Sequence, residues 1–228
     1  MTSRLQRLLE RARSREGTFW QRRGWAAAAF AETEGQPAVL RQARILERIL
    51  QEAPAVIGAE ELLVGTQPCA PIPAEAPAGP AMVPDIEALR SEEQRRAMRA
   101  GVFTSSIKTG HLTPDYPRLL GAGIEGVLDE VQARRARGDA EHAALWEAME
   151  ITLRAASGFV SRHADLADGE AATCEDVARR EELTAIAGAC RQVATGAPRT
   201  LHEALQLLWF TYLIQCLENG ESTGAFAL

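Results

Sequence analysis

The sequence predicts a mainly α-helical protein, and three features support this prediction. Along most of the chain, apolar residues recur at intervals of three and four, which is the spacing of one helix face. Ser91 with Gln94, and Thr200 with Glu203, have the spacing of a capping box at a helix start. Runs that alternate apolar and polar residues, as half-buried strands do, are few. We therefore expect a series of packed helices.

Composition limits the class of protein. The chain has 228 residues, enough for one core or for one domain plus the start of another. Of these residues 46% are apolar and 25% charged, values typical of a soluble globular protein. Its net charge of −6 comes with no sustained basic block, which argues against nucleic-acid binding. No apolar run reaches the roughly 18–20 residues that span a bilayer. Because residues 1–17 also lack the apolar region of a signal peptide, we expect a cytoplasmic protein that does not enter membranes.

The cysteines and histidines do not form a metal-binding pattern. No C-x-x-C pair occurs, so neither a zinc site nor a disulfide framework is predicted, and free, mostly buried thiols are expected. His142 and His163 fall on predicted helices without a partner at ligand spacing, so we interpret them as structural. His202 is followed four residues later by Gln206, which excludes a zincin helix. The four widely spaced cysteines are Cys69, Cys174, Cys190 and Cys216.

Residues 2–65 are predicted to form three short helices and an extended segment. The third helix begins near Pro37, because a first helical turn tolerates the missing N–H of proline, and it stops at Pro54. Residues 57–64 then form a short buried run that Gly65 closes. One face of this helix carries the apolar residues Val39, Ala43, Leu46 and Leu50.

The middle of the chain is interrupted by proline. Residues 67–84 hold six of the eleven prolines and cannot form a regular helix, so they are interpreted as a surface crossing. A capped helix then runs to about Arg99. Residues 101–117, rich in Thr, Ser, Gly and Pro, are predicted to be a loop before a helix over 118–138.

Three helices are predicted in the last third, over 143–167, over 175–193, and from residue 201 onward. The last carries apolar residues on nearly every face and should be deeply buried. Its residues Leu208, Trp209, Phe210 and Leu213 are expected to form an exposed apolar patch unless a further part of the protein covers them. After it, Asn219-Gly220 is a turn signal.

Five segments resemble, in the same order, the N-terminal part of the glycyl radical enzymes, the family of pyruvate formate-lyase and of glycerol, choline and hydroxyproline lyases. Residues 31–65 end in ELLVG. Residues 109–126 resemble a "GH…DY…L…G…G" motif. Residues 159–167 resemble "aryl-x-x-Arg-Tyr-Ala-x-x-Ala", with histidine in place of tyrosine. Residues 179–190 resemble "R-x-x-EL-x-x-IA-x-x-C", and residues 198–210 resemble "P-x-T-x-x-EA-x-Q-x-x-WF".

The resemblance implies a fold and a chemistry. The fold would be the N-terminal helical lobe of a ten-stranded α/β barrel, with only the first barrel elements present. Residues 1–228 would form an incomplete pyruvate formate-lyase-type domain, with 67–84 as a crossing segment inside it. The implied activity is radical C–O, C–N, C–C or C–S cleavage of a small polar metabolite by an anaerobic enzyme.

The family also implies the cofactor and the partners. It uses no bound cofactor beyond a protein glycyl radical. A separate S-adenosylmethionine, iron–sulfur activating enzyme installs this radical, and the full-length enzymes are usually homodimers. The expected partners are therefore the small-molecule substrate, the activating enzyme and a second copy of the full-length chain.

The resemblance singles out His111 as a substrate-facing residue. A lone histidine after glycine in a loop is more often an ordinary hydrogen-bonding residue. In the dehydratase branch of the family, however, the histidine of this loop points at the substrate, where a neutral imidazole can donate to or accept from a leaving hydroxyl. The loop favours this branch over pyruvate formate-lyase itself. A second substrate-facing position, eight residues earlier, falls on Phe103, with Thr104, Ser105 and Ser106 as alternatives.

Two further positions are weighed. Where the family barrel begins, a small polar residue often faces the substrate, and Ser222 or Thr223 would match it. Asp115 and Tyr116 suggest acid–phenol chemistry, but we favour a turn after Pro114 that caps the next helix.

Both radical motifs of the family are missing from these 228 residues. Gly-Cys-x-Glu, which carries the thiyl cysteine, and Arg-Val-x-Gly, which carries the radical glycine, do not occur. No catalytic residue is therefore assigned, and we expect a fragment that is inactive alone. The alternatives are a non-catalytic helical remnant or interaction module, and a formate C-acetyltransferase proper.

Overall fold

The computed structural model describes residues 2–14, 19–66, 69–76, 91–102, 113–138 and 141–219. Within these ranges the regular structure is helical, as predicted from the apolar spacing. The helices are α1 (Ser3–Arg13), α2 (Arg22–Glu32), α3 (Ala38–Glu52), α5 (Glu92–Arg99), α6 (Tyr116–Ala136), α7 (Ala143–Thr173), α8 (Val177–Thr195) and α9 (Leu201–Asn219).

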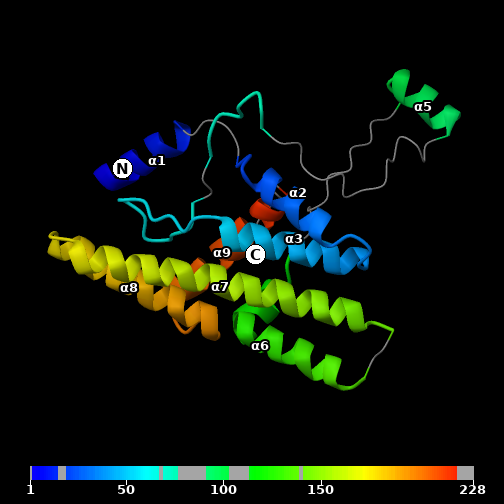
Figure 1. The fold of residues 1–228 in the computed structure, drawn as a ribbon. Coiled ribbons are helices and arrows are strands. Elements are labelled where there is room, and N and C mark those ends of the chain that lie inside the picture. The colour runs from blue at the N-terminus through cyan, green and yellow to red at the C-terminus, as the bar shows by residue number, and fades with distance from the viewer. Residues whose placement is uncertain are drawn as a thin grey trace.

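The long helix α7 is the centre of the arrangement. In Figure 1, α3 lies on one side of α7, while α8 and α6 lie along its two halves on the other side. Helix α9 packs against α8 and α3. The main apolar core lies among α3, α7, α8 and α9, and α2 contributes at its edge. Its most buried large residues are Phe19, Ile49, Leu50, Val160, Ile186, Leu207, Phe210 and Leu217.

The helix starts agree with the predicted capping residues. Ser91 and Gln94 form a complete capping box on α5, in which each side chain accepts a hydrogen bond from the other residue's backbone N–H. Thr200 and Glu203 do the same on α9. Asp115 accepts from the N–H of Arg118 and caps α6. Asp115 is therefore a helix cap, as we favoured from sequence.

Helix α3 is confirmed, and the segment after it is extended as predicted, but the expected burial of residues 57–64 is wrong for most of them, since only Gly58 and Val64 are buried and Leu62 is 45% exposed. Pro37 is the N-cap residue rather than the first helical residue, and residues 54–64 are non-helical. Val39, predicted on the buried face, is 37% exposed, because the core side of α3 is completed instead by Ile45 and Ile49.

Two predicted helices differ in detail. The helix expected over 118–138 is interrupted at Gly123, whose φ of 70° and ψ of 177° are not helical. There α6 passes so close to the turn between α8 and α9 that a Cβ on Gly123 would lie 2.5 Å from the carbonyl of Gly196. Helix α7 continues to Thr173 rather than stopping near residue 167. Its last turns pack on α8 through the buried Ala171, and Asp168 pairs there with Arg191.

The expected apolar patch on α9 is largely absent. Leu208, Phe210 and Leu213 are only 7%, 0% and 4% exposed, so that prediction is wrong for these three residues. The chain itself covers two of them, because a Cβ on Gly65 would lie 2.8 Å from Phe210 and 3.0 Å from Leu213. Trp209 remains partly exposed. The exposed apolar residues of α9 are Leu201 and Leu205.

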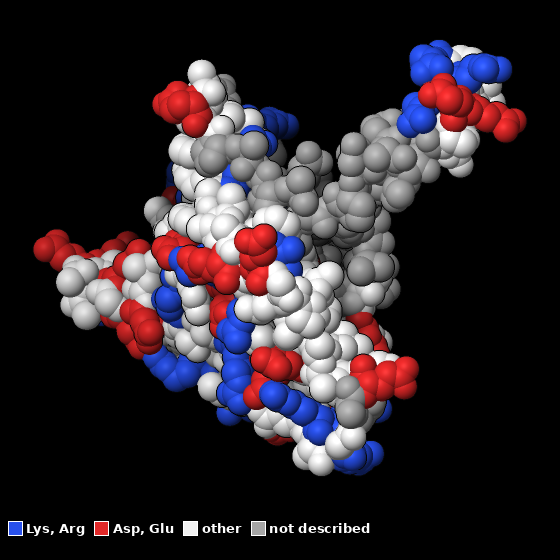
Figure 2. Space-filling model, turned by 45° about the vertical axis from the view of Figure 1, so that its right-hand side comes forward, with Lys and Arg blue, Asp and Glu red and all other residues white. Residues whose placement is uncertain are grey.

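The surface carries both signs of charge. On the face shown in Figure 2, acidic and basic side chains are interleaved over the helices. Among the helices of the described ranges, none is both long and apolar enough to cross a membrane. The part of the proline-rich crossing that is described, residues 69–76, is not helical.

Candidate functional site

The residues predicted to face a substrate lie outside the described residues. This holds for His111 and Phe103, for the alternatives at 104–106, and for Ser222 and Thr223. The candidate site is therefore described through the residues that flank these segments and through the contacts of the five motifs.

Helix α6 follows one of these segments in the sequence and α9 precedes the other, and these two helices are in contact. Tyr116, the first residue of α6, is 4% exposed, and its burial raises the pKa of its phenol. The pKa of Tyr212 on α9 is also raised, first by burial and then by Cys216 and Tyr116. Tyr116 and Cys216 both act on the Tyr212 phenol, and α6 contacts α9, so these three residues are called the polar cluster. The polar cluster is carried by the two helices that flank the predicted site residues in the sequence.

Helix α9 holds the backbone of the extended segment that follows α3. It does so through His202, Gln206 and Trp209, which follow one another at about one helical turn. The buried side chain of Gln206 accepts from the N–H of Val64 at 2.9 Å and donates to the carbonyl of the same residue at 2.8 Å. Trp209 donates from its indole N–H to the carbonyl of Gly65 at 2.8 Å. His202 lies 2.8 Å from the carbonyl of Leu62, on the exposed side of the contact.

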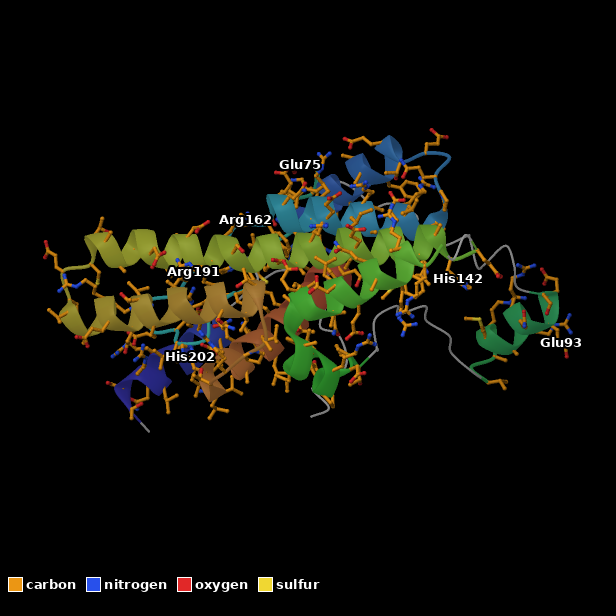
Figure 3. All side chains as sticks on the ribbon, turned by 90° about the horizontal axis from the view of Figure 1, so that it is seen from below. Glu75, Glu93, His142, Arg162, Arg191 and His202 are labelled. Atoms are coloured by element: carbon orange, nitrogen blue, oxygen red, sulfur yellow. The ribbon has the colours of Figure 1, made fainter. Side chains whose placement is uncertain are left out.

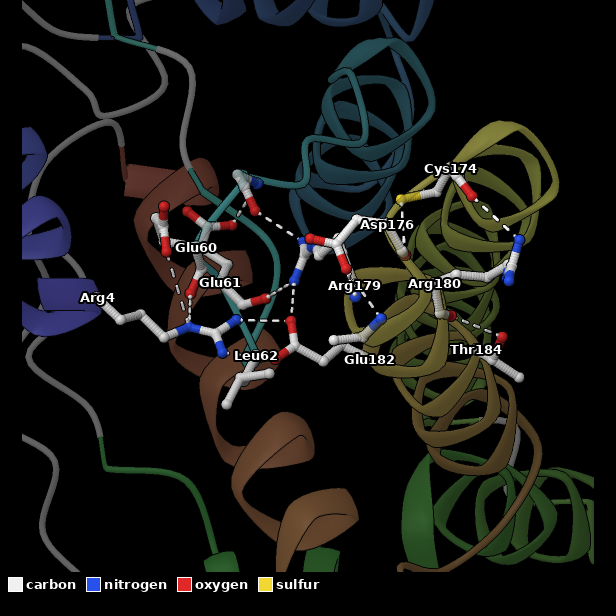
Figure 4. Close-up of polar contacts among 12 residues, drawn as sticks. Arg4, Glu60, Glu61, Leu62, Cys174, Asp176, Arg179, Arg180, Glu182 and Thr184 are labelled. Atoms are coloured by element: carbon white, nitrogen blue, oxygen red, sulfur yellow. Dashed lines mark hydrogen bonds and ion pairs between the residues drawn. The ribbon is translucent and has the colours of Figure 1, made fainter. Parts of the chain in front are cut away.

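Helix α8 holds the preceding part of the segment through Arg179. Its guanidinium donates to the carbonyls of Gly58 and Glu61 at 3.0 and 2.9 Å and pairs with Glu182 at 3.0 Å (Figure 4). Glu182 in turn accepts two hydrogen bonds from Arg4 of α1, at 2.6 and 2.8 Å. The bonds from Arg4 and Arg179 lower the pKa of the Glu182 carboxyl to about 2.

Helix α1 is attached to the body by these ion pairs. It has no buried residue. Arg4 binds Glu182 and the carbonyl of Glu60, and Arg7 pairs with the Glu60 carboxylate at 2.6 Å. Because ion pairs at a surface are screened by salt, this attachment should depend on ionic strength.

We expect Arg4→Gln to release α1 without unfolding the core. Hydrogen exchange should show loss of protection across residues 3–13, while the urea midpoint changes little, because no residue of α1 belongs to the buried core. High salt should have the same effect on the unmodified chain. Arg13→Gln is the matched control, since Arg13 makes none of these ion pairs. Unchanged α1 protection in Arg4→Gln would contradict the ion-pair attachment.

The motif histidine, His163, is buried within an aromatic cluster. Its ring is 1% exposed and lies edge-on to Phe159 and Phe210, with centroid distances of 4.8 and 4.9 Å. Nδ1 is 3.0 Å from the carbonyl of Phe159, and Nε2 is 3.4 Å from the N–H of Val56. A carbonyl only accepts and an N–H only donates, so the ring is neutral with its proton on Nδ1. The structural interpretation of His163 is confirmed.

Burial makes His163 a source of acid sensitivity. Burial is the main reason that its pKa falls from 6.5 to about 4. The unfolded chain therefore binds a proton between these values that the folded chain does not bind, so stability falls as the pH falls through this window. We expect unfolding free energy to drop by about 2 kcal/mol between pH 8 and pH 5 from this group alone.

Urea unfolding at a series of pH values tests this expectation. His163→Phe keeps an aromatic ring, is less stable at pH 8 because Val56 loses its acceptor, and has a shallower pH dependence. His142→Gln should retain the full slope, since His142 lies at the exposed start of α7. Identical slopes for His163→Phe and the unmodified chain would contradict the assignment.

The described residues contain no group of three or more His, Cys, Asp or Glu side chains able to hold a metal ion. All four cysteines are free. Burial raises the pKa of the Cys190 thiol to about 12, so it stays protonated and unreactive at neutral pH.

The contacts also show which residues sequence reasoning missed. Gln206 and Arg179 belong to the quoted motifs, but no chemical role was predicted for them. Their partners are backbone groups 118 to 142 residues away in the sequence. A polar residue inside an otherwise apolar helix was the available signal for Gln206, because a buried amide requires partners.

Comparison with known proteins gives a consistent set of matches. The family model described as pyruvate formate lyase-like matches residues 78–226. The (2S)-3-sulfopropanediol dehydratase of Klebsiella oxytoca is 40% identical over 120 residues, which is 50% of this chain and 14% of that protein. The isethionate sulfite-lyase of Oleidesulfovibrio alaskensis is 33% identical over 128 residues, or 53% of this chain and 15% of that protein.

Solved structures match nearly the whole chain. The glycerol-bound B12-independent glycerol dehydratase from Clostridium butyricum has a TM-score of 0.81 and 24% identity, covering 98% of this chain and 35% of that one. A structure concerning 1,2-propanediol dehydration in Roseburia inulinivorans has a TM-score of 0.77 and 26% identity, covering 97% and 32%. The chain therefore has the fold of about one third of these proteins.

Proposed function

The chain belongs to the pyruvate formate lyase-like family, and on that basis we propose that it is part of a glycyl radical lyase or dehydratase. The proposed reaction is radical cleavage of a C–O, C–N, C–C or C–S bond in a small polar metabolite. The observation that carries the proposal is the 40% identity over 120 residues to a dehydratase. The chain spans only 14% of that relative, so the activity of the complete protein is inferred and not observed.

Within this function, the chain's own residues bind, orient and shield. We assign His111, Phe103 and Ser222 to substrate contact. A neutral imidazole at His111 would donate to or accept from a leaving hydroxyl. The polar cluster of Tyr116, Tyr212 and Cys216 would support the two segments that carry these residues. The helical casing around them would exclude water and oxygen from the radical.

The radical chemistry itself requires a thiyl cysteine and a radical glycine. The thiyl and radical-glycine motifs do not occur in the 228 residues, so we propose that this chain has no turnover by itself. The partners we propose are the activating enzyme that installs the glycyl radical, a second copy in the full-length form, and the small-molecule substrate. We propose a cytoplasmic location for this assembly.

A second function is favoured by one observation. Phe210 and Leu213 are covered by the chain's own Gly65, as a self-sufficient helical module would require. A non-catalytic interaction module is therefore the competing proposal. Monodisperse behaviour and cooperative urea unfolding of the 228 residues would favour it, and aggregation of the isolated chain would count against it.

The test uses the chain alone and a chimera. The 228 residues, co-expressed with an activating enzyme under anaerobic conditions, should give no glycyl radical signal in electron paramagnetic resonance. A chimera in which they replace the matching lobe of the Clostridium butyricum glycerol dehydratase should give the signal and convert glycerol.

His111→Ala in the chimera should retain the radical signal and lose turnover, because the radical glycine is contributed by the other part of the chimera. His142→Ala, at the exposed start of α7, is the control and should retain both. A radical signal from the 228 residues alone would overturn the proposal, and so would a folded chimera that carries the radical but never turns over.

A further inference from the structure

A small notch lies between α3 and α7, near the end of α3. Its volume is about 310 Å³. Three residues of α3 line one side, and five residues of α7 line the other. They are Glu47, Leu50 and Gln51, and Arg154, Ala155, Gly158, Phe159 and Arg162. Figure 3 shows Arg162 on the side of α7 that faces α3.

Arg162 is a partly buried cation without a carboxylate partner. In the part of the chain that is described, its guanidinium donates to the carbonyl of Leu50 at the end of α3 and lies 5.5 Å from the ring centre of Phe159. Burial lowers the pKa of Arg162. The charge of the Glu52 carboxylate acts in the opposite direction, but the two side chains do not form an ion pair. A guanidinium has five N–H donors, so most of its donors remain available to a ligand.

The shape of the notch follows from Gly158. Arg154, Gly158 and Arg162 are spaced four residues apart and so lie along one face of α7. A Cβ on Gly158 would meet nothing within 4 Å, so this position leaves an open gap between the two arginines. A side chain at this position would therefore start in open space and extend into the gap.

Two of the carboxylates near the notch are already paired, and the third, Glu52, makes no ion pair with Arg162 among the described residues. Glu47 accepts from Arg44 at 2.8 Å, and Glu150 binds Arg154 at 2.9 Å. Neither carboxylate neutralises Arg162. The α7 side of the notch therefore carries a positive charge on the guanidinium of Arg162, and burial reduces the hydration of this group.

We propose that this notch binds a small organic anion, with its carboxylate or phosphate group on Arg162 and a compact apolar body against Ala155 and Phe159. The planar fork of arginine matches the oxygens of both groups. The apolar atoms of the lining accommodate the body of the ligand, as in most small-molecule sites. This assignment is independent of the proposed radical chemistry.

Isothermal titration calorimetry on the 228-residue chain tests the proposal with three probes: benzoate, phenyl phosphate and inorganic phosphate, at constant ionic strength set with chloride. We expect one saturable site, with benzoate or phenyl phosphate binding more tightly than inorganic phosphate. The comparison of the two organic probes identifies the preferred head group.

Two variants localise the site. Gly158→Leu should weaken binding about tenfold or more by filling the gap, while it stabilises the helix because glycine is a poor helix former. Gly188→Leu, at another helical glycine with open space around its Cβ position, should stabilise equally and leave binding unchanged. Arg162→Lys keeps the charge but not the fork and should also weaken binding.

Three results would overturn the proposal: no saturable heat with any probe, equal affinity of Gly158→Leu and the unmodified chain, or equal weakening in Gly158→Leu and Gly188→Leu. Because Gly158→Leu is expected to fold at least as well as the unmodified chain, loss of its binding cannot be attributed to unfolding. Its urea midpoint is measured in parallel to establish this.

Discussion

Gly123→Ala should be among the most destabilising single substitutions in this chain, lowering the free energy of unfolding by about 3 kcal/mol or more. The φ of 70° and ψ of 177° at this position belong to a region that is essentially restricted to glycine, and an alanine there is strained by roughly 1–3 kcal/mol. The added Cβ would also lie 2.5 Å from the backbone carbonyl of Gly196. Displacing backbone to relieve such a contact costs about another 1–3 kcal/mol.

The matched control lies two residues away. Gly121 is helical, and a Cβ there would meet nothing within 4 Å. Gly121→Ala should therefore stabilise the chain by about 0.5–1 kcal/mol through helix propensity. Urea unfolding of the two variants should give midpoints displaced in opposite directions. A Gly123→Ala chain as stable as the unmodified one would show that the kink in α6 is not required.

The helices that could be predicted are those whose signals are local. Capping pairs such as Thr200 with Glu203 act over three residues, and the apolar repeat is visible within one helix. The interruption at Gly123 depends instead on the turn at Gly196, which is 73 residues further along the chain. A glycine inside an apolar repeat does not reveal that the backbone of another turn crosses it.

The burial of α9 likewise depends on a contact with a distant part of the chain. Its apolar surface was visible in the sequence, but the element that covers it was not. Gly65 lies on Phe210 and Leu213 because glycine has no side chain to hold the two backbones apart. The absence of a side chain leaves no apolar signal, so the covering segment could not be matched to the helix it covers.

The motif resemblance located the important positions without giving their physical roles. Arg179 and Gln206 bind backbone groups of the 56–64 segment, and His163 accepts from Val56 in the same segment. Three motifs therefore converge on a single stretch of extended chain. That stretch has no partner strand in the described residues, so side chains from three helices satisfy its backbone.

Gln206 is the residue on which this convergence depends most. It is 0% exposed, and its amide makes both hydrogen bonds of Val64, at 2.9 and 2.8 Å. Gln206→Leu has a similar shape but leaves a buried N–H and a buried carbonyl without partners. Each unsatisfied group costs about 1–3 kcal/mol, so we expect a loss of about 4 kcal/mol in unfolding free energy. Hydrogen exchange at the Val64 amide should accelerate at the same time.

Two variants separate hydrogen bonding from packing. Gln206→Glu can still accept from the N–H of Val64, but its carboxyl can donate to the Val64 carbonyl only when it is protonated, so it should also be destabilising, and most strongly at high pH where the carboxyl is charged. Trp209→Phe keeps an aromatic ring but removes the bond to Gly65, from a partly exposed side chain, and should lose about 1 kcal/mol. If Gln206→Leu lost no more than Trp209→Phe, the extended segment would be held by the packing of Gly65 on Phe210 rather than by the amide of Gln206.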